Sequence, residues 1–182
     1  PIKSSAASDV YKRQVRNTRK LKEITFDEAD ALATFWHEIT HNRNKPGNTR
    51  MTSLQTQYME LANEFVARKT LPEFYEGVGG KMQHPEFMAD RQSTGYNTWV
   101  RNYCKVIELT GANAEKVLSA VREHLFSQSY AEQEAGLVNA LMQSGALKAD
   151  GTKLKKSEVK RIVKGCLMFG EDMLQKYVES IR

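Results

Sequence analysis

Apolar residues recur at helical spacing through most of the chain beyond residue 25. The first such stretch covers about residues 26–42 and follows Thr25, which forms a capping box with the glutamate three residues later. A second stretch begins near Thr52 and is expected to end before Pro72, because proline has no backbone N–H to donate within a helix. Further helices are predicted at residues 97–109, 114–127, 130–144 and 156–181.

The remaining stretches have no clear period. Residues 73–95 are rich in glycine and predict a loop with a short helix around Pro85–Arg91, and no strand is convincing anywhere. Residues 1–14 have neither helical nor strand periodicity, and we interpret them as a non-native tail. The predicted fold is therefore mainly α, with a first part over residues 15–95 and a C-terminal helical bundle over residues 96–182.

Composition and charge limit the kinds of partner that this protein is expected to bind. Apolar content of 40% and charged content of 27% are typical of a globular protein, and no run of about 18 apolar residues predicts a membrane helix. The net charge of +5 comes from one end, because residues 1–22 contain seven Lys or Arg and one Asp. The rest holds 20 basic and 21 acidic residues, and this near-neutral body disfavours a nucleic-acid partner.

A motif of the form H-E-x-x-H lies within the first predicted helix, at His37, Glu38 and His41. Two histidines four residues apart project from one face of a helix, where both imidazoles can bind the same Zn²⁺. A glutamate beside the first ligand reaches a metal-activated water and takes its proton as that water attacks a carbonyl group. The motif therefore predicts a zinc site with Glu38 as the general base.

A catalytic zinc also needs a third protein ligand. The metzincin pattern would place glycine at position 44 and histidine at position 47, where this sequence has Asn44 and Gly47. The other common solution is a carboxylate from the next helix, and Glu60 and Glu64 lie four residues apart on one face of it. The candidates for a residue that stabilises the oxyanion are Tyr75, His84 and Tyr96.

The segment Asn63–Ala67, which reads N-E-F-V-A, resembles the segments that carry the third ligand in gluzincin aminopeptidases and in lethal factor-like peptidases. It is also similar to the A-N-x-F-A segment of the ImmA/IrrE-type metallopeptidases of mobile elements. The gluzincin comparison makes Glu64 the ligand. Spacing favours Glu60, because 18 residues separate it from His41, and the ImmA/IrrE comparison also places the ligand nearer Glu60. We take Glu64 as the predicted ligand and Glu60 as its alternate.

The resemblance covers about residues 25–70 and implies a zinc-dependent metallopeptidase acting on a peptide or protein substrate. It also implies a β-sheet upstream of the motif helix, and we expect that sheet to be missing from a chain that is a fragment of a larger protein. A phage or mobile-element origin and a bacterial cytoplasmic location follow from the same resemblance. The alternative is a non-enzymatic helical interaction module with a vestigial or structural metal site, in which Glu38 would have no role.

Overall fold

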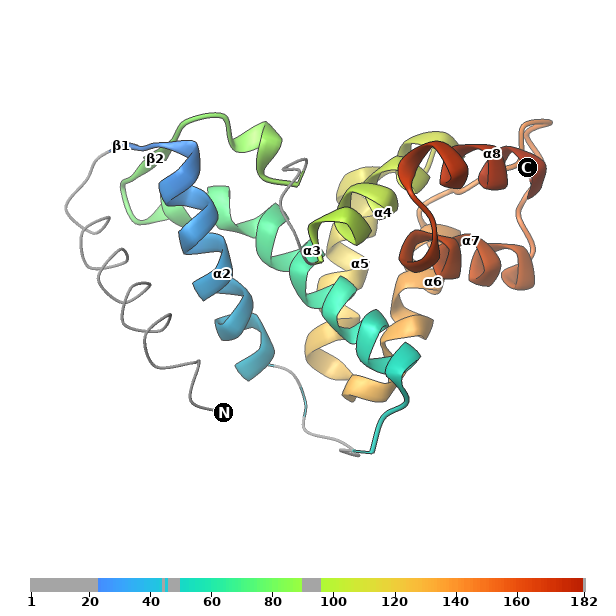
Figure 1. The fold of residues 1–182 in the computed structure, drawn as a ribbon, viewed down its shortest axis with the longest axis horizontal. Helices are drawn as coiled ribbons and strands as arrows, with labels where there is room; N and C mark the ends of the chain where they lie inside the picture. Colours follow the sequence, from blue (N-terminus) through green and yellow to red (C-terminus); the bar gives the residue numbers. More distant parts are fainter. Residues whose placement is uncertain (1–22, 44, 46–49, 90–95, 182) are drawn as a thin grey trace.

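The computed structural model describes residues 23–43, 45, 50–89 and 96–181. The tail predicted over residues 1–14 lies outside them, as does the basic stretch that ends at Lys22. Within the described residues the chain is mainly helical, as predicted, and its elements are arranged as in Figure 1. In chain order they are β1 (Glu23–Ile24), α2 (Phe26–Asn42), α3 (Ser53–Gly77), β2 (Lys81–Met82), η1 (Pro85–Ala89), α4 (Asn97–Thr110), α5 (Ala114–Ser127), η2 (Tyr130–Glu132), α6 (Gln133–Gln143), α7 (Lys156–Met168) and α8 (Glu171–Ile181).

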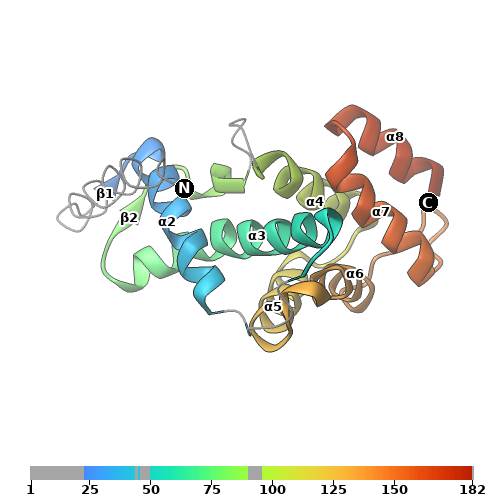
Figure 2. The same cartoon turned by 60° about the horizontal axis from the view of Figure 1, so that its bottom comes forward.

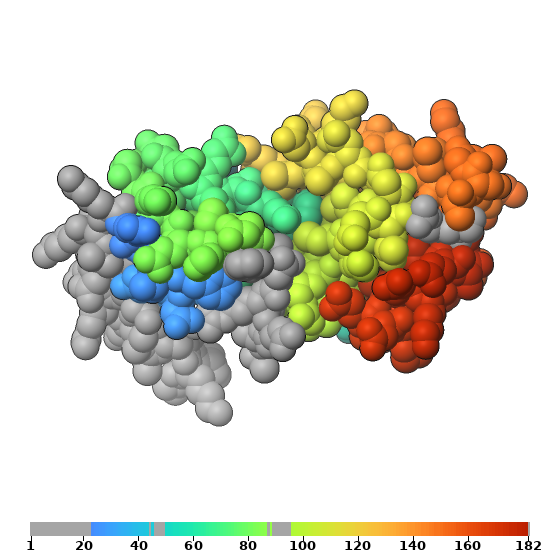
Figure 3. Space-filling view, turned by 90° about the horizontal axis from the view of Figure 1, so that it is seen from above, coloured from blue at the N-terminus to red at the C-terminus, as the bar shows by residue number. Residues whose placement is uncertain are grey.

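Helix α3 is the central element, with α4 along one side and α5 and α6 along the other (Figure 2). Its N-terminal half buries Tyr58, Leu61 and Phe65 in a large core shared with α4 to α8. Its C-terminal half buries Leu71 and Tyr75 in a smaller core shared with β1, α2, β2 and η1. The blue and green elements around the small core therefore lie at one end of the molecule, and the orange and red helices lie at the other (Figure 3).

Local sequence signals set the start of both site-bearing helices. Thr25 accepts a hydrogen bond from the backbone of Glu28, and the Glu28 carboxylate accepts one from the backbone of Thr25. Thr52 and Gln55 form the same reciprocal pair at the start of α3. The capping box predicted at Thr25 and the predicted bounds of α2 are thus confirmed. In the described part of the chain, no helix combines the length and the apolar character that a bilayer crossing requires.

The prediction that the chain has no strand was wrong, because the described residues include one pair of short strands. Strands β1 and β2 are two residues each and pair in parallel, with Ile24 opposite Met82. Both of these side chains are buried in the small core. A strand of two residues is too short to produce an alternating pattern, so its pairing depends on contacts between distant segments that periodicity does not reveal.

The predicted end of the second helix before Pro72 was also wrong, because α3 continues to Gly77. Proline inside a helix removes one backbone hydrogen bond and normally ends or kinks it. Here the residues around it, Leu71 and Tyr75, are buried in the small core. Their burial offsets the lost hydrogen bond, so tertiary packing outweighs the local preference.

The stretch predicted as one helix over residues 156–181 is two helices, α7 and α8, separated by Phe169 and Gly170. A buried side chain from α4 accounts for the break. The side-chain amide of Asn102 donates to the backbone carbonyls of Cys166 and Phe169, at 2.8 Å in each case. These carbonyls lie at the C-terminal end of α7, where a helix has no N–H groups of its own to satisfy them.

Replacing Asn102 with alanine is expected to lower the free energy of unfolding by about 1–3 kcal/mol, because two carbonyls then lose their donor in a buried position. Urea denaturation followed by circular dichroism measures this change. The control is Asn42→Ala, at an exposed helix end, where a change within about 0.5 kcal/mol is expected. Equal effects of the two substitutions would contradict the capping role of Asn102.

Candidate metal centre

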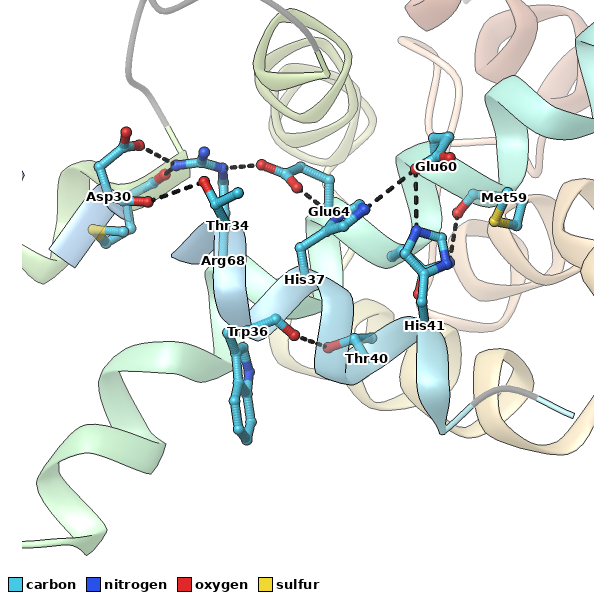
Figure 4. A network of polar contacts seen from close by, with 12 residues as sticks. Asp30, Thr34, Trp36, His37, Thr40, His41, Met59, Glu60, Glu64 and Arg68 are labelled. Carbon is cyan, nitrogen blue, oxygen red and sulfur yellow. Dashed lines mark hydrogen bonds and ion pairs between the residues drawn. The ribbon is translucent and has the colours of Figure 1, made fainter. Parts of the chain in front are cut away.

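Helices α2 and α3 pack against each other and bring the motif histidines opposite two glutamates (Figure 4). His37 and His41 project from one face of α2, and Glu60 and Glu64 project from the facing side of α3. Trp36 points away from this cluster, where its ring stacks on Phe74 and its indole N–H donates to Thr70. Neighbouring positions on α2 thus have separate roles, Trp36 in packing against α3 and His37 in the cluster.

The apolar residues that recur along α2 are only partly buried. Leu32 is buried, whereas the Phe35 side chain is 40% exposed. An apolar residue at helical spacing is therefore not always a core residue, because a small core covers only a narrow stripe of each helix.

One carboxylate oxygen of Glu60 is shared between both histidines. Its Oε2 atom lies 3.3 Å from Nε2 of His37 and 3.2 Å from Nε2 of His41. One ligand atom from each of these three residues lies within 4.8 Å of the others, so the group could hold a metal ion. The His41 and Glu60 side chains keep 19% and 15% of their surface exposed, which leaves this side of the group accessible.

Glu64 lies on the other side of the His37 ring. Its Oε2 atom is 2.6 Å from Nδ1 of His37, a close ionic contact without the angles of a hydrogen bond. Its second oxygen, Oε1, accepts a hydrogen bond from Nε of Arg68. Both oxygens of Glu64 therefore have protein partners. The structure brings both predicted third ligands to the cluster, but only Glu60 contacts the two histidines together.

The charged groups of the cluster shift one another's pKa values. Burial alone would lower the pKa of His37, but the carboxylates of Glu60 and Glu64 outweigh it and raise that pKa to about 9. Burial alone would raise the pKa of Glu60, yet His37 and His41 lower it to about 2. The pKa of Glu64 is also lowered despite its burial, by His37 and Arg68. In the metal-free protein both carboxylates are therefore ionised at neutral pH.

Glu38 and Tyr96 lie outside the three-residue ligand group. Glu38 is exposed on α2, next to His37 in sequence. The ring of Tyr96 stacks on that of His37 with centroids 6.0 Å apart, and it also stacks on Trp99 at 5.1 Å. Burial raises the pKa of Tyr96, and the nearby negative charges of Glu60, Glu64 and Glu38 add to the effect. Tyr96 therefore keeps its proton at neutral pH and remains a hydrogen-bond donor.

The other two candidates for the oxyanion role lie elsewhere. Tyr75 is buried in the small core, and His84 is exposed beyond β2, where it contacts Glu86. The sequence reasoning missed Arg68 and Asp30, which join the cluster through Glu64. The spacing of Glu64 and Arg68, four residues apart on one helix, was a signal of this pair. The contact with Asp30 depends on how α2 and α3 pack.

The donor atoms suit a transition metal. Two imidazole nitrogens and one carboxylate oxygen are ligands that Zn²⁺ accepts, and a set of three leaves a coordination position open. Comparisons with protein families, with curated proteins and with solved structures gave no match to this chain. The chemistry of the site is therefore argued from its own geometry.

Proposed function

We propose that this protein is a zinc-dependent peptide hydrolase in which His37, His41 and Glu60 hold the metal and Glu38 is the general base. The observation that carries the proposal is the convergence of one nitrogen from each histidine on a single Glu60 oxygen, with Glu38 adjacent in the motif. A bound zinc supplies a Lewis acid that lowers the pKa of water and polarises a carbonyl group.

The choice of Glu60 as the third ligand departs from our preference at the sequence level, which was Glu64. Glu60 is favoured because its Oε2 atom already contacts both histidine nitrogens. Glu64 is disfavoured because one of its oxygens is bonded to Arg68 and the other contacts the far nitrogen of the His37 ring. Coordination by Glu64 would require the loss of at least one of these buried contacts.

The remaining groups have roles that follow from their charge and position. Glu38 is an exposed carboxylate, so it accepts a proton from the attacking water and later donates it to the leaving amine. Tyr96 retains its hydroxyl proton and stacks beside His37, a place from which it can donate to the oxygen that gains charge in the transition state.

The test is hydrolysis by the purified chain loaded with one equivalent of zinc and incubated with a mixture of unfolded proteins and peptides. We expect new peptide termini, detected by mass spectrometry, that disappear with a zinc chelator and return when zinc is restored. A chain that binds zinc at this site but cleaves no peptide bond would contradict the hydrolase. That result would favour a helical interaction module with a structural metal.

A further inference from the structure

We infer that Glu64, Arg68 and Asp30 form a buried positioning network that orients His37 for metal binding, with Arg68 at its centre. The inference rests on the proposed metal site and assigns Glu64 a role other than that of a ligand. The His37 ring has two nitrogens, and each of them faces a different carboxylate. Nε2 faces Glu60 at 3.3 Å, and Nδ1 faces Glu64 at 2.6 Å.

A histidine binds a metal through one nitrogen while the other carries a proton and donates to a neighbouring group. That second partner selects the tautomer and stops the ring from rotating. In this protein Glu64 occupies that position. Its Oε2 atom lies 2.6 Å from Nδ1 in a charged contact that lacks hydrogen-bond angles in the metal-free protein, and the Nε2 atom remains on the side of Glu60 and His41. Among the described ion pairs, no carboxylate contacts Nδ1 of His41. The proposed positioning network therefore acts on His37.

Arg68 is needed because Glu64 is itself a buried, flexible side chain. The Arg68 side chain is 4% exposed, and its Nε atom donates to Oε1 of Glu64. This contact fixes the carboxylate plane and supplies the positive charge that a buried carboxylate requires. Without it, Glu64 could turn toward solvent or toward the metal, and Nδ1 of His37 would lose its partner.

The network also contacts α2, the helix that carries both histidines. Nη1 of Arg68 donates to Oδ1 of Asp30 on α2 and to the backbone carbonyl of Met88 in η1, at 3.0 Å each. Asp30 lies seven residues before His37, so α2 is tied to α3 at both Asp30 and His37 (Figure 4). One guanidinium group therefore links three segments, and the planar fork of arginine allows it to reach them together.

The experiment measures metal affinity in the full chain with Zn²⁺ in competition with a chromophoric chelator, and with Co²⁺ as a spectroscopic probe. The variants are Glu64→Gln, Arg68→Met and Asp30→Asn. Lys69→Met is the matched control, because it removes an exposed cation from the neighbouring position of the same helix. Circular dichroism and thermal melting identify variants that fold, and Asp30→Asn provides a milder change if Arg68→Met does not fold.

We expect Glu64→Gln and Arg68→Met each to weaken zinc binding by about 10–100-fold and to alter the Co²⁺ absorption bands, while saturating zinc still gives one metal per chain. Arg68→Lys is expected to restore part of the affinity, and the double variant to be little weaker than either single one, because both residues act through the same nitrogen. Lys69→Met should leave affinity and bands unchanged.

Two results would overturn the inference; the first leaves the proposed function intact, and the second changes only its third ligand. One is a folded Arg68→Met or Asp30→Asn variant with wild-type affinity and an unchanged Co²⁺ spectrum. The other is a Glu64→Gln variant that binds no metal while Glu60→Gln still binds one, since Glu64 would then be the ligand. A wild-type chain that binds neither metal would instead remove the proposed function, and the inference with it.

Discussion

Replacing His41 with alanine is expected to reduce the zinc bound to the purified protein from about one ion per chain to almost none. The site proposed here has three protein ligands, and this substitution leaves only His37 and Glu60. Two ligands on adjacent helices do not retain zinc against dialysis, because each lost ligand bond lowers affinity by orders of magnitude. Elemental analysis of both proteins after dialysis against metal-free buffer measures the difference.

The matched control is His84→Ala, which removes an exposed histidine outside the cluster. It should keep the wild-type zinc content, so that loss in the His41 variant cannot be attributed to having one histidine fewer. A His41→Ala protein that is folded and still carries one zinc would show that the metal is bound elsewhere. A folded wild-type protein without zinc would remove the site itself.

Replacing Glu38 with glutamine is expected to lower kcat for peptide hydrolysis by about 10²–10⁴-fold while the zinc content stays the same. Glutamine has the same shape but cannot accept the proton of the attacking water. Glu38 is exposed and lies outside the three-residue ligand group, so its replacement should not disturb metal binding or folding. The measurements are steady-state hydrolysis of a peptide that the wild type cleaves, and elemental analysis of the same sample.

Glu76→Gln is the control, because Glu76 is an exposed glutamate near the C-terminal end of α3, and its activity should match the wild type. A zinc-loaded Glu38→Gln protein with wild-type kcat would exclude Glu38 as the base. Loss of zinc in this variant would instead indicate that Glu38 is a ligand. The pair of measurements therefore separates the chemical role of the residue from a role in holding the metal.

The sequence predicted the helices well where short-range signals act alone. The capping box at Thr25 and the helical period after it placed α2 correctly, and hence the shared face of His37 and His41. The errors occurred where distant contacts outweigh local preference. Burial of Leu71 and Tyr75 carries α3 past its proline, and Asn102 ends α7 from a separate helix. Neither contact has a signature within a short window of sequence.

The same limit applies to the candidate site. The motif identified the two histidines and Glu38, and helical spacing reduced the third ligand to Glu60 or Glu64. Choosing between these two requires the rotation of α3 about its axis relative to α2, which periodicity does not fix. In the structure that rotation directs Glu60 toward both histidines and Glu64 toward Nδ1 of His37 alone. The division of the chain at residues 95 and 96 stays a prediction, because residues 90–95 lie outside the described part.

The shared position of α3 between two cores has a thermodynamic consequence. The two histidines are on α2, which is held by the small core, whereas Glu60 is on the half of α3 that belongs to the large one. A metal bound by all three would act as a cross-link between the less and the more extensively packed parts of the protein. Metal binding and the docking of α2 would then be linked equilibria, so that free metal at about 1,000 times its Kd adds about 4 kcal/mol against any opening that separates the two helices.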